Sequence, residues 1–331
     1  MSGPVTARPD PATPLLEVSD LHTHFETDEG VARAVDGVSL SVPPGRTLGI
    51  LGESGCGKTM TALSILRLVT PPGRIVAGSI VYKGQDLLQL SERAMRRVRG
   101  KEIAMVFQEP MTSLNPVFTI ASQIGEAVRL HQRLDRAATR ARGIESLRLV
   151  EMPEPERCAQ SYPHELSGGM RQRAMIAMAL ACEPSLLIAD EPTTALDVTI
   201  QAQILDLLHG LRDRFGMAMI LVTHDLGIVA EQTDEVAVMY AGRIVEQAPV
   251  VEIFECPRHP YTVALMQSVG KLGDEPRRRL DALAGAVPSL MHLPSGCRFR
   301  DRCPRAIDEC TRIDPHLERK APGHLAACIR I

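Results

Sequence analysis

Aromatic residues are scarce in this chain of 331 residues: they make up 3% of it, and tryptophan is absent. A core must therefore be built from aliphatic side chains, and apolar residues, at 44%, are numerous enough to form one. The chain also lacks a strong charge of either sign, since its formal net charge is −3. A nucleic-acid-binding body is usually strongly basic, so the composition argues against nucleic acid as a partner.

Long apolar runs are missing too, and none reaches the roughly 18 residues of a membrane-spanning helix. Residues 1–14 are rich in proline and contain no apolar signal core, so we expect a disordered leader there and a protein that stays in the cytoplasm. Disulfides are rare in that compartment. Of the eight cysteines, four are scattered and read as ordinary small residues: Cys56, Cys158, Cys182 and Cys256.

The segment Gly52–Thr59 matches G-x-x-x-x-G-K-[ST], the pattern of a phosphate-binding loop. It follows an apolar run of strand length (48–51) and precedes helical spacing over residues 60–69. Backbone N–H groups of such a loop face phosphate oxygens, and the start of the helix adds its own free N–H groups. Lys58 suits contact with the β- and γ-phosphates, and the Thr59 hydroxyl suits Mg²⁺.

Two acids follow a second apolar run. Leu186–Asp190 has the pattern of a buried parallel strand that ends in a carboxylate, and Glu191 comes next. Asp190 suits coordination of Mg²⁺ through water, and Glu191 suits a base that polarises the attacking water. A strand predicted over 217–223 ends at His224, at the sheet edge where ligands bind, so His224 is placed to hydrogen-bond a γ-phosphate.

Helical spacing over residues 119–150 predicts a helical insert between strand-rich halves. Ser167 suits the N-cap of the next helix, and the glycine pair after it makes that helix start an anion site. Two residues are ambiguous by themselves. Phe25 suits either adenine stacking or the core, and Gln108 ends a strand, where it suits a cap as well as a ligand contact.

In this order, the motifs resemble the nucleotide-binding subunit of an ABC transporter, over roughly residues 15–247. The similarities are Gly52–Thr59 to Walker A, Gln108 to the Q-loop, Leu166–Gln172 to the signature motif, Leu186–Asp190 with Glu191 to Walker B and its catalytic Glu, Ala195–Asp197 to the D-loop and His224 to the switch His. The resemblance implies an α/β fold: a P-loop NTPase domain of the ABC type over 15–255, with a helical subdomain at about 115–182.

The resemblance also implies a site. Catalytic roles fall to Lys58, Gln108, Glu191 and His224. Nucleotide contacts fall to Phe25, Gly52, Ser54, Gly55, Cys56, Gly57, Lys58, Thr59, Met60, Ser167, Gly168, Gly169 and Asp197, and Mg²⁺ ligands are Thr59, Gln108 and Asp190.

The remainder, over 256–331, resembles the C-terminal extension of oligopeptide and dipeptide importers, on motifs such as His259–Thr262 and Arg302–Pro304. The form of the signature motif is similar to that of the "D" subunit of such importers. This implies import of peptides, with a second ATPase subunit in a heterodimer, two permease subunits and an extracytoplasmic peptide-binding protein, at the cytoplasmic face of the membrane. A nickel or other small-solute importer and a soluble, non-transport ABC ATPase are the alternatives.

The other four cysteines, Cys297, Cys303, Cys310 and Cys328, are spaced C-x5-C-x6-C-x17-C near the end of the chain. A small terminal segment with few apolar residues needs a staple to fold, and a metal is the better one in a reducing compartment. Zinc and an iron–sulfur cluster suit four thiolates equally by ligand type. Zinc ligands usually come in C-x2–4-C pairs, so the wide spacing favours a [4Fe–4S] cluster. Some importers of the family carry one, and zinc or unmetallated thiols remain as alternatives.

Overall fold

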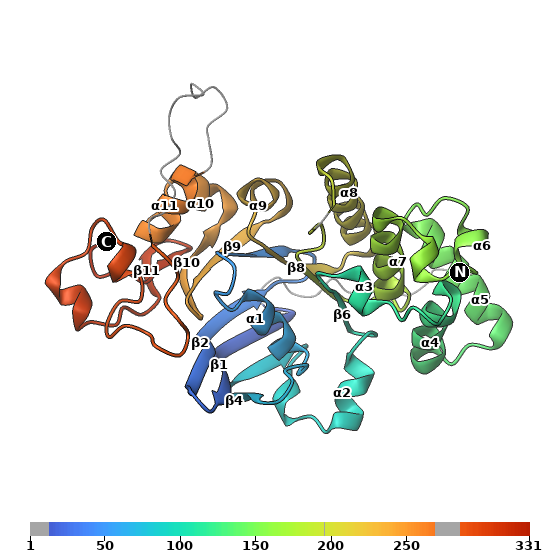
Figure 1. The fold of residues 1–331 in the computed structure, drawn as a ribbon, viewed down its shortest axis with the longest axis horizontal. Coiled ribbons are helices and arrows are strands. Elements are labelled where there is room, and N and C mark those ends of the chain that lie inside the picture. The colour runs from blue at the N-terminus through green and yellow to red at the C-terminus, as the bar shows by residue number, and fades with distance from the viewer. Residues whose placement is uncertain (1–12, 195, 269–284) are drawn as a thin grey trace.

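The computed structural model describes residues 13–194, 196–268 and 285–331. Most of the predicted leader and Ala195 of the D-loop motif lie outside these ranges. Within them the chain forms two β-sheets and a separate group of helices (Figure 1). Among the helices of the described ranges, none has the length and apolar character that crossing a membrane requires.

The N-terminal part of the chain forms an antiparallel sheet in the order β2-β1-β4-β5. Its strands are β1 (Leu16–Thr27), β2 (Gly30–Val42), β4 (Gly73–Tyr82) and β5 (Gln85–Asp86). Along β1, Leu16 and Val18 are buried while Glu17 between them is exposed. This alternation lays one face of the sheet on the core and leaves the other in water.

A larger, mixed sheet has the order β11-β12-β10-β9-β3-β8-β7-β6. Its strands are β3 (Thr47–Leu51), β6 (Ile103–Val106), β7 (Leu186–Asp190), β8 (Ala218–Thr223), β9 (Glu235–Tyr240), β10 (Arg243–Pro249), β11 (Glu318–Ala321) and β12 (His324–Ala326). The strands from β9 to β6 run parallel. Every residue of β3, β7 and β8 is buried, as near-continuous apolar runs predict. Because these strands are parallel, their carboxyl ends meet at one edge, where the site lies.

The α-helices are α1 (Lys58–Ile65), α2 (Glu92–Val98), α3 (Pro110–Ser113), α4 (Ile120–Gln132), α5 (Arg136–Leu149), α6 (Pro155–Cys158), α7 (Gly168–Leu180), α8 (Val198–Phe215), α9 (Leu226–Gln232), α10 (Val250–Glu255) and α11 (Pro260–Ser268). Short 3-10 helices are η1 (Leu87–Gln89), η2 (Pro163–Glu165), η3 (Arg300–Arg302) and η4 (Asp308–Thr311). Helix α1 packs between the two sheets, in contact with β1, β2 and β7. Helices α8–α10 cover the other face of the larger sheet (Figure 1).

The helical insert differs from the sequence prediction in one respect. The spacing predicted helix throughout residues 119–150, whereas the structure has two helices, α4 and α5. Arg133 adopts a left-handed conformation (φ 54°) that ends α4, and the Asp135 side chain accepts a hydrogen bond from the Ala138 N–H, which starts α5. Chain breaks of this kind leave the apolar spacing intact, so the periodicity did not reveal the turn.

The C-terminal extension, residues 256–331, is built onto the larger sheet. Strand β12 pairs with β10. The buried Glu246 of β10 accepts hydrogen bonds from the backbone N–H groups of Arg258 and His259 and contacts His324 Nε2 at 2.6 Å. Three of the few aromatic rings, those of Tyr240, Tyr261 and Phe299, pack together beside it, with ring centroids 4.6–5.4 Å apart.

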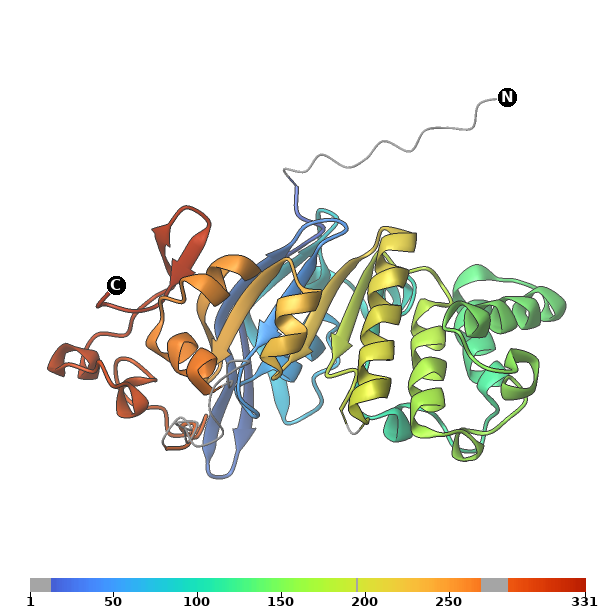
Figure 2. The same cartoon turned by 90° about the horizontal axis from the view of Figure 1, so that it is seen from above.

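The extension and the helical insert lie at opposite ends of the molecule in both views (Figures 1 and 2). The parallel strands occupy the middle, so the carboxyl-end edge of the sheet lies between these two ends. The phosphate loop after β3 is close to the extension, as its contacts below show.

Candidate functional site

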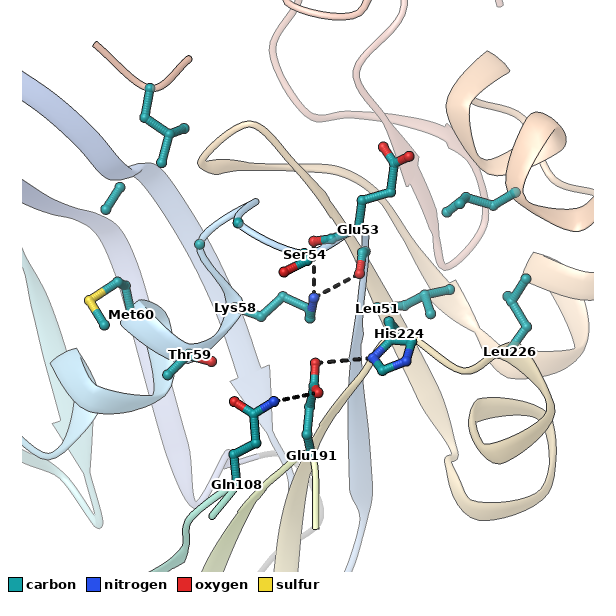
Figure 3. Close-up of a pocket in the computed structure, with 16 residues that line it drawn as sticks. Leu51, Glu53, Ser54, Lys58, Thr59, Met60, Gln108, Glu191, His224 and Leu226 are labelled. Carbon is teal, nitrogen blue, oxygen red and sulfur yellow. Dashed lines mark hydrogen bonds and ion pairs between the residues drawn. The ribbon is translucent and has the colours of Figure 1, made fainter. Parts of the chain in front are cut away.

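A pocket of about 700 Å³ opens at the carboxyl ends of the parallel strands. Most of the phosphate loop lines it, together with Gln108, Glu191 and His224 (Figure 3). These three side chains follow β6, β7 and β8 in the chain, and Leu265 and Leu290 of the extension complete the wall. The structure therefore brings the four residues predicted as catalytic, Lys58 included, to one pocket.

The phosphate loop has the backbone that its glycines permit. Gly57 has φ 107°, a value that residues with a Cβ rarely adopt, and a Cβ there would overlap the carbonyl oxygen of Ala34. Lys58 begins α1, and its ammonium donates to the carbonyl oxygens of Gly52 at 2.7 Å and Glu53 at 3.0 Å. The Lys58 ammonium thus lies inside the curve of the loop, where it would bind phosphate oxygens in place of these carbonyl oxygens.

Thr59 and Asp190 face each other across the floor of the site. The Thr59 hydroxyl donates to Asp190 Oδ1 at 3.1 Å. The pKa of Asp190 is raised to about 6, chiefly by burial, although the hydrogen bond from Thr59 opposes the rise. A hydroxyl and a buried carboxylate with few compensating charges form an oxygen ligand set that suits Mg²⁺, whose charge would favour the ionised acid.

Glu191 is held by three neighbours. Gln108 Nε2 donates to Glu191 Oε2 at 2.9 Å and the Thr194 hydroxyl donates to the same oxygen at 3.0 Å, while His224 Nδ1 lies 3.1 Å from Oε1 (Figure 3). The backbone of Glu191 is left-handed (φ 44°), which is strained for a residue with a side chain. The carboxylate is thereby fixed at the mouth of the pocket, opposite the phosphate loop.

Other predicted nucleotide contacts lie apart from this pocket in the described part of the chain. Ser167 caps α7 by accepting from the Met170 N–H, and Asp197 caps α8 by accepting from the Ile200 N–H. Gly168 and Gly169 begin α7, in the helical insert. Phe25 is half-buried on β1, where its ring lies against Gly73. Within the described residues, the predicted site residues that come together are therefore those that line the pocket, with Asp190 beside Thr59.

Two more residues of the loop region were predicted as nucleotide contacts, and two residues near the site were not predicted. Met60 lines the pocket, whereas Cys56 is fully buried beneath the loop. Thr194 was not predicted, although it lies three residues after Glu191, close enough in sequence for its hydroxyl to reach that carboxylate. The Tyr261 hydroxyl accepts from the Glu53 N–H at 3.0 Å, a contact across 208 positions that no local pattern indicates.

A second site lies in the extension, where Cys297, Cys303, Cys310 and Cys328 line one small pocket. All four are free thiols. Burial and the neighbouring thiols raise the pKa of Cys297 to about 11, and burial also raises that of Cys303. A raised pKa keeps these thiols protonated at neutral pH, so they are less nucleophilic than an exposed cysteine.

The four cysteine sulfurs share a pocket but are not tightly clustered. Among the described residues, the one set of three potential ligand atoms lying within 4.8 Å of one another is that of His22, His24 and Asp36. No three of the four cysteine sulfurs therefore all lie within 4.8 Å of one another in the described part of the chain. Around a tetrahedral zinc, with bonds of about 2.3 Å, sulfurs would lie only about 3.8 Å apart.

Comparison with known proteins agrees with this arrangement. Residues 35–194 match the ABC transporter family, and residues 245–310 match the oligopeptide/dipeptide transporter C-terminal region. The chain is 58% identical to a probable peptide ABC transporter ATP-binding protein, y4tR, of Sinorhizobium fredii, over 96% of this chain and 95% of that one. It is 48% identical to the dipeptide transport ATP-binding protein DppD of Escherichia coli, over 95% of this chain and 96% of that one.

Among solved structures, the chain is similar to the dimeric ATP-binding cassette MJ0796 bound to ADP and Pi, with a TM-score of 0.65 and 26% identity. The similarity covers 71% of this chain and 98% of that one. The predicted fold class is thereby confirmed. The chain belongs to the ATP-binding subunits of the ABC transporter family and carries the C-terminal region of its oligopeptide and dipeptide transporters.

Proposed function

We propose that this chain binds and hydrolyses ATP to power peptide import by an ABC transporter, at the cytoplasmic face of the membrane. The observation that carries the proposal is Glu191, held by Gln108 and His224 opposite an intact phosphate loop. The names of the relatives favour peptides over nickel as cargo. The ATPase domain is assigned to residues 15–255, with a helical subdomain at about 115–182, and the extension to 256–331.

Each residue of the pocket has a proposed task. Lys58 and the loop N–H groups bind the β- and γ-phosphates of ATP. Thr59, Asp190 and Gln108 hold Mg²⁺, which neutralises phosphate charge. Glu191 accepts the proton of the attacking water, and His224 hydrogen-bonds the γ-phosphate. Gln108 contacts Glu191 directly, so movement of the loop after β6 would shift the base and link the helical insert to hydrolysis.

A second ATPase subunit completes the site in this proposal. The α7 start with Ser167, Gly168 and Gly169, and Asp197 at the start of α8, are absent from the described lining of the pocket. We propose that these residues face the ATP of a partner subunit, in a heterodimer of the "D" type, and that Phe25 stacks on the adenine of the chain's own ATP. Two permeases and an extracytoplasmic peptide-binding protein form the rest of the transporter.

The pairing is tested by co-expressing the chain with its candidate partner ATPase. Glu191→Gln should trap an ATP-dependent dimer, because ATP remains bound between the two subunits. Ser167→Arg in the same chain should weaken this dimer by placing a bulky cation where α7 meets the partner's ATP, while Gln160→Arg, at an exposed position of the insert, serves as the control. A trapped dimer that is unaffected by Ser167→Arg would contradict the composite site.

We also propose that Cys297, Cys303, Cys310 and Cys328 hold a [4Fe–4S] cluster. Support comes from their common pocket and from their wide, uneven spacing in the sequence, which lacks the close pairs usual for zinc. The cluster would serve to hold together the segment that carries the four cysteines.

Anaerobically purified protein should be brown, with broad absorption near roughly 400 nm from thiolate-to-iron charge transfer. Cys303→Ser should remove the colour, while Cys256→Ser, at an exposed cysteine outside the pocket, should keep it. Colourless protein with one zinc per chain and no iron would overturn the assignment.

The transport role is tested by co-purification with the membrane subunits. We expect the chain to be recovered with both permeases and to hydrolyse ATP faster when the loaded peptide-binding protein is added. Recovery with no permease under conditions that keep the membrane subunits intact would contradict the proposal.

A further inference from the structure

Glu53 presents a problem for a phosphate-binding loop. It is the second residue of the loop, whose glycines and N–H groups are arranged to receive a polyanion. A carboxylate aimed into that curve would repel the phosphates, and such repulsion is strong where water is partly excluded. The loop therefore requires an interaction that either neutralises the Glu53 carboxylate or turns its side chain away from the phosphates.

Arg302 of the extension supplies that interaction. Its guanidinium donates to both carboxylate oxygens of Glu53, Nη1 to Oε2 at 2.6 Å and Nη2 to Oε1 at 2.9 Å. The Arg302 side chain is only 5% exposed. Figure 3 shows the Glu53 side chain pointing away from Lys58 and Glu191. A bidentate, largely buried ion pair of this kind is stronger and more directional than an ion pair at the surface.

Tyr261 holds the same loop residue by its backbone. Its hydroxyl accepts from the Glu53 N–H at 3.0 Å, and its ring packs on Tyr240. The guanidinium of Arg302 lies over the Tyr240 ring, 5.7 Å from the centroid. Main chain and side chain of Glu53 are thus both fixed by one aromatic and cationic cluster that includes the extension.

Arg302 is in turn placed by the four-cysteine pocket. It ends η3, between Cys297 and Cys303 in the chain, and its backbone N–H donates to Phe299 O at 3.0 Å. The Cys297 N–H donates to Cys310 O at 2.9 Å, which joins this turn to the next part of the pocket. Any change that spreads the cysteines must therefore move the turn that carries Arg302.

We propose that Arg302 is a positioning residue for the ATP site, and that the occupant of the four-cysteine pocket sets nucleotide affinity through it. The second half rests on the proposed metal group, whereas the first half rests only on the contacts above. Loss of the occupant loosens η3, releases Glu53 toward the phosphates and weakens ATP binding.

The first half is tested by equilibrium binding of a fluorescent ATP analogue to the full chain. Arg302→Gln should weaken binding by about 5- to 50-fold, within the usual range of coupling between sites. Adding Glu53→Gln to it should restore binding, because the unpaired carboxylate is then gone. Arg302→Lys, which keeps the charge but not the bidentate contact, should have an intermediate affinity for ATP. It replaces Arg302→Gln in the experiment if Arg302→Gln does not fold. Arg312→Gln, at an exposed arginine of the extension, is the control.

If the double variant Arg302→Gln/Glu53→Gln binds ATP as weakly as Arg302→Gln, Arg302 does not act through the charge of Glu53. If the double variant does not fold, equally weak binding by Arg302→Lys and Arg302→Gln leads to the same conclusion. Normal binding by Arg302→Gln overturns the first half as well.

The second half is tested by Cys303→Ser in two backgrounds. In the otherwise natural chain it should weaken ATP binding as Arg302→Gln does. In the Arg302→Gln/Glu53→Gln background it should change binding by less than about twofold, as expected when two changes act through one contact. An equal loss of ATP binding in both backgrounds would show that the cysteines do not act through the contact between Arg302 and Glu53. Natural protein without any metal would remove the second half and the cluster together, and the rescue by Glu53→Gln would still decide the first.

Discussion

Single residues divide the work of the pocket between binding and chemistry. Glu191→Gln keeps the shape of the site but removes the base, so we expect ATP binding to persist while hydrolysis slows by about 10²- to 10⁴-fold. Lys58→Ala should weaken binding itself, because the phosphates lose their point charge. Binding of a fluorescent ATP analogue and phosphate release by the assembled transporter separate the two effects. Normal turnover by Glu191→Gln would show that another group activates the water.

Asp36 gives a second test at this scale. Burial by itself would raise the pKa of this carboxyl, but Arg298 and Arg243 outweigh it and lower the pKa to about 2. Because the folded-state value lies below the unfolded value near 3.9, the contribution to stability is present above about pH 4 and is lost as the pH falls toward 2. Asp36→Asn should therefore cost about 2–3 kcal/mol of unfolding free energy at neutral pH.

Chemical denaturation of the natural chain and Asp36→Asn across pH measures this loss. The difference between the two should shrink as the pH falls from about 4 toward about 2. Asp28→Asn, in the exposed turn between β1 and β2, should stay within about 0.5 kcal/mol of the natural chain. A difference that does not change with pH would mean that the carboxylate charge is not what stabilises the contact with the extension.

Sequence could predict Lys58, Asp190 and Glu191 because each follows a strand pattern whose end must lie at the ligand edge of the sheet. It could not predict the ion pair of Arg302 with Glu53, which joins residues 249 positions apart. Such a contact depends on the path of the whole extension, and a charged residue in a loop gives no local indication of its partner.

Among the elements, α3 and the segment that follows it are the best candidates for contact with the membrane subunits. Leu114 is buried and anchors the segment, whereas Met111, Val117 and Phe118 are exposed, with relative exposures of 54%, 71% and 51%. Apolar side chains gathered on one exposed segment often mark an interaction site. A cysteine at Thr112 should therefore cross-link to a permease in the intact transporter.

A cysteine at Val251, an exposed position of α10 on another part of the molecule, is the matched control. We expect cross-links from Thr112 and Ser113 and none from Val251. Equal absence of cross-links from all three positions would count against a docking role for this segment.

Elements were predictable where burial is regular. The strands β7 and β8 lie where the apolar patterns indicated. The extension was not, because it is rich in proline and its strands β11 and β12 are only four and three residues long. They join the larger sheet because β12 pairs with β10 and β11 pairs with β12. The buried Glu246 and His324 that support this pairing carry polar side chains that a core pattern would not include.

At the scale of the whole molecule, the pocket and the start of α7 belong to different parts of the chain. The motif order identified both, but only the structure shows that the pocket is lined without Ser167–Gly169 in its described residues. The extension contacts the phosphate loop at Glu53, whereas the helical insert that carries α7 lies at the opposite end of the molecule (Figure 1). The proposed role of the cysteine pocket and the proposed pairing with a partner therefore involve different parts of the same subunit.

The central claim is that ATP hydrolysis, with Glu191 as the base, drives import. Transport in reconstituted vesicles tests this claim most directly. Vesicles holding the permeases, both ATPase subunits and internal ATP should accumulate peptide delivered by the binding protein. The same vesicles with Glu191→Gln should bind ATP yet accumulate about 10²-fold less or worse, following the loss of the base. Accumulation at the natural rate with Glu191→Gln, or without ATP, would contradict the claim.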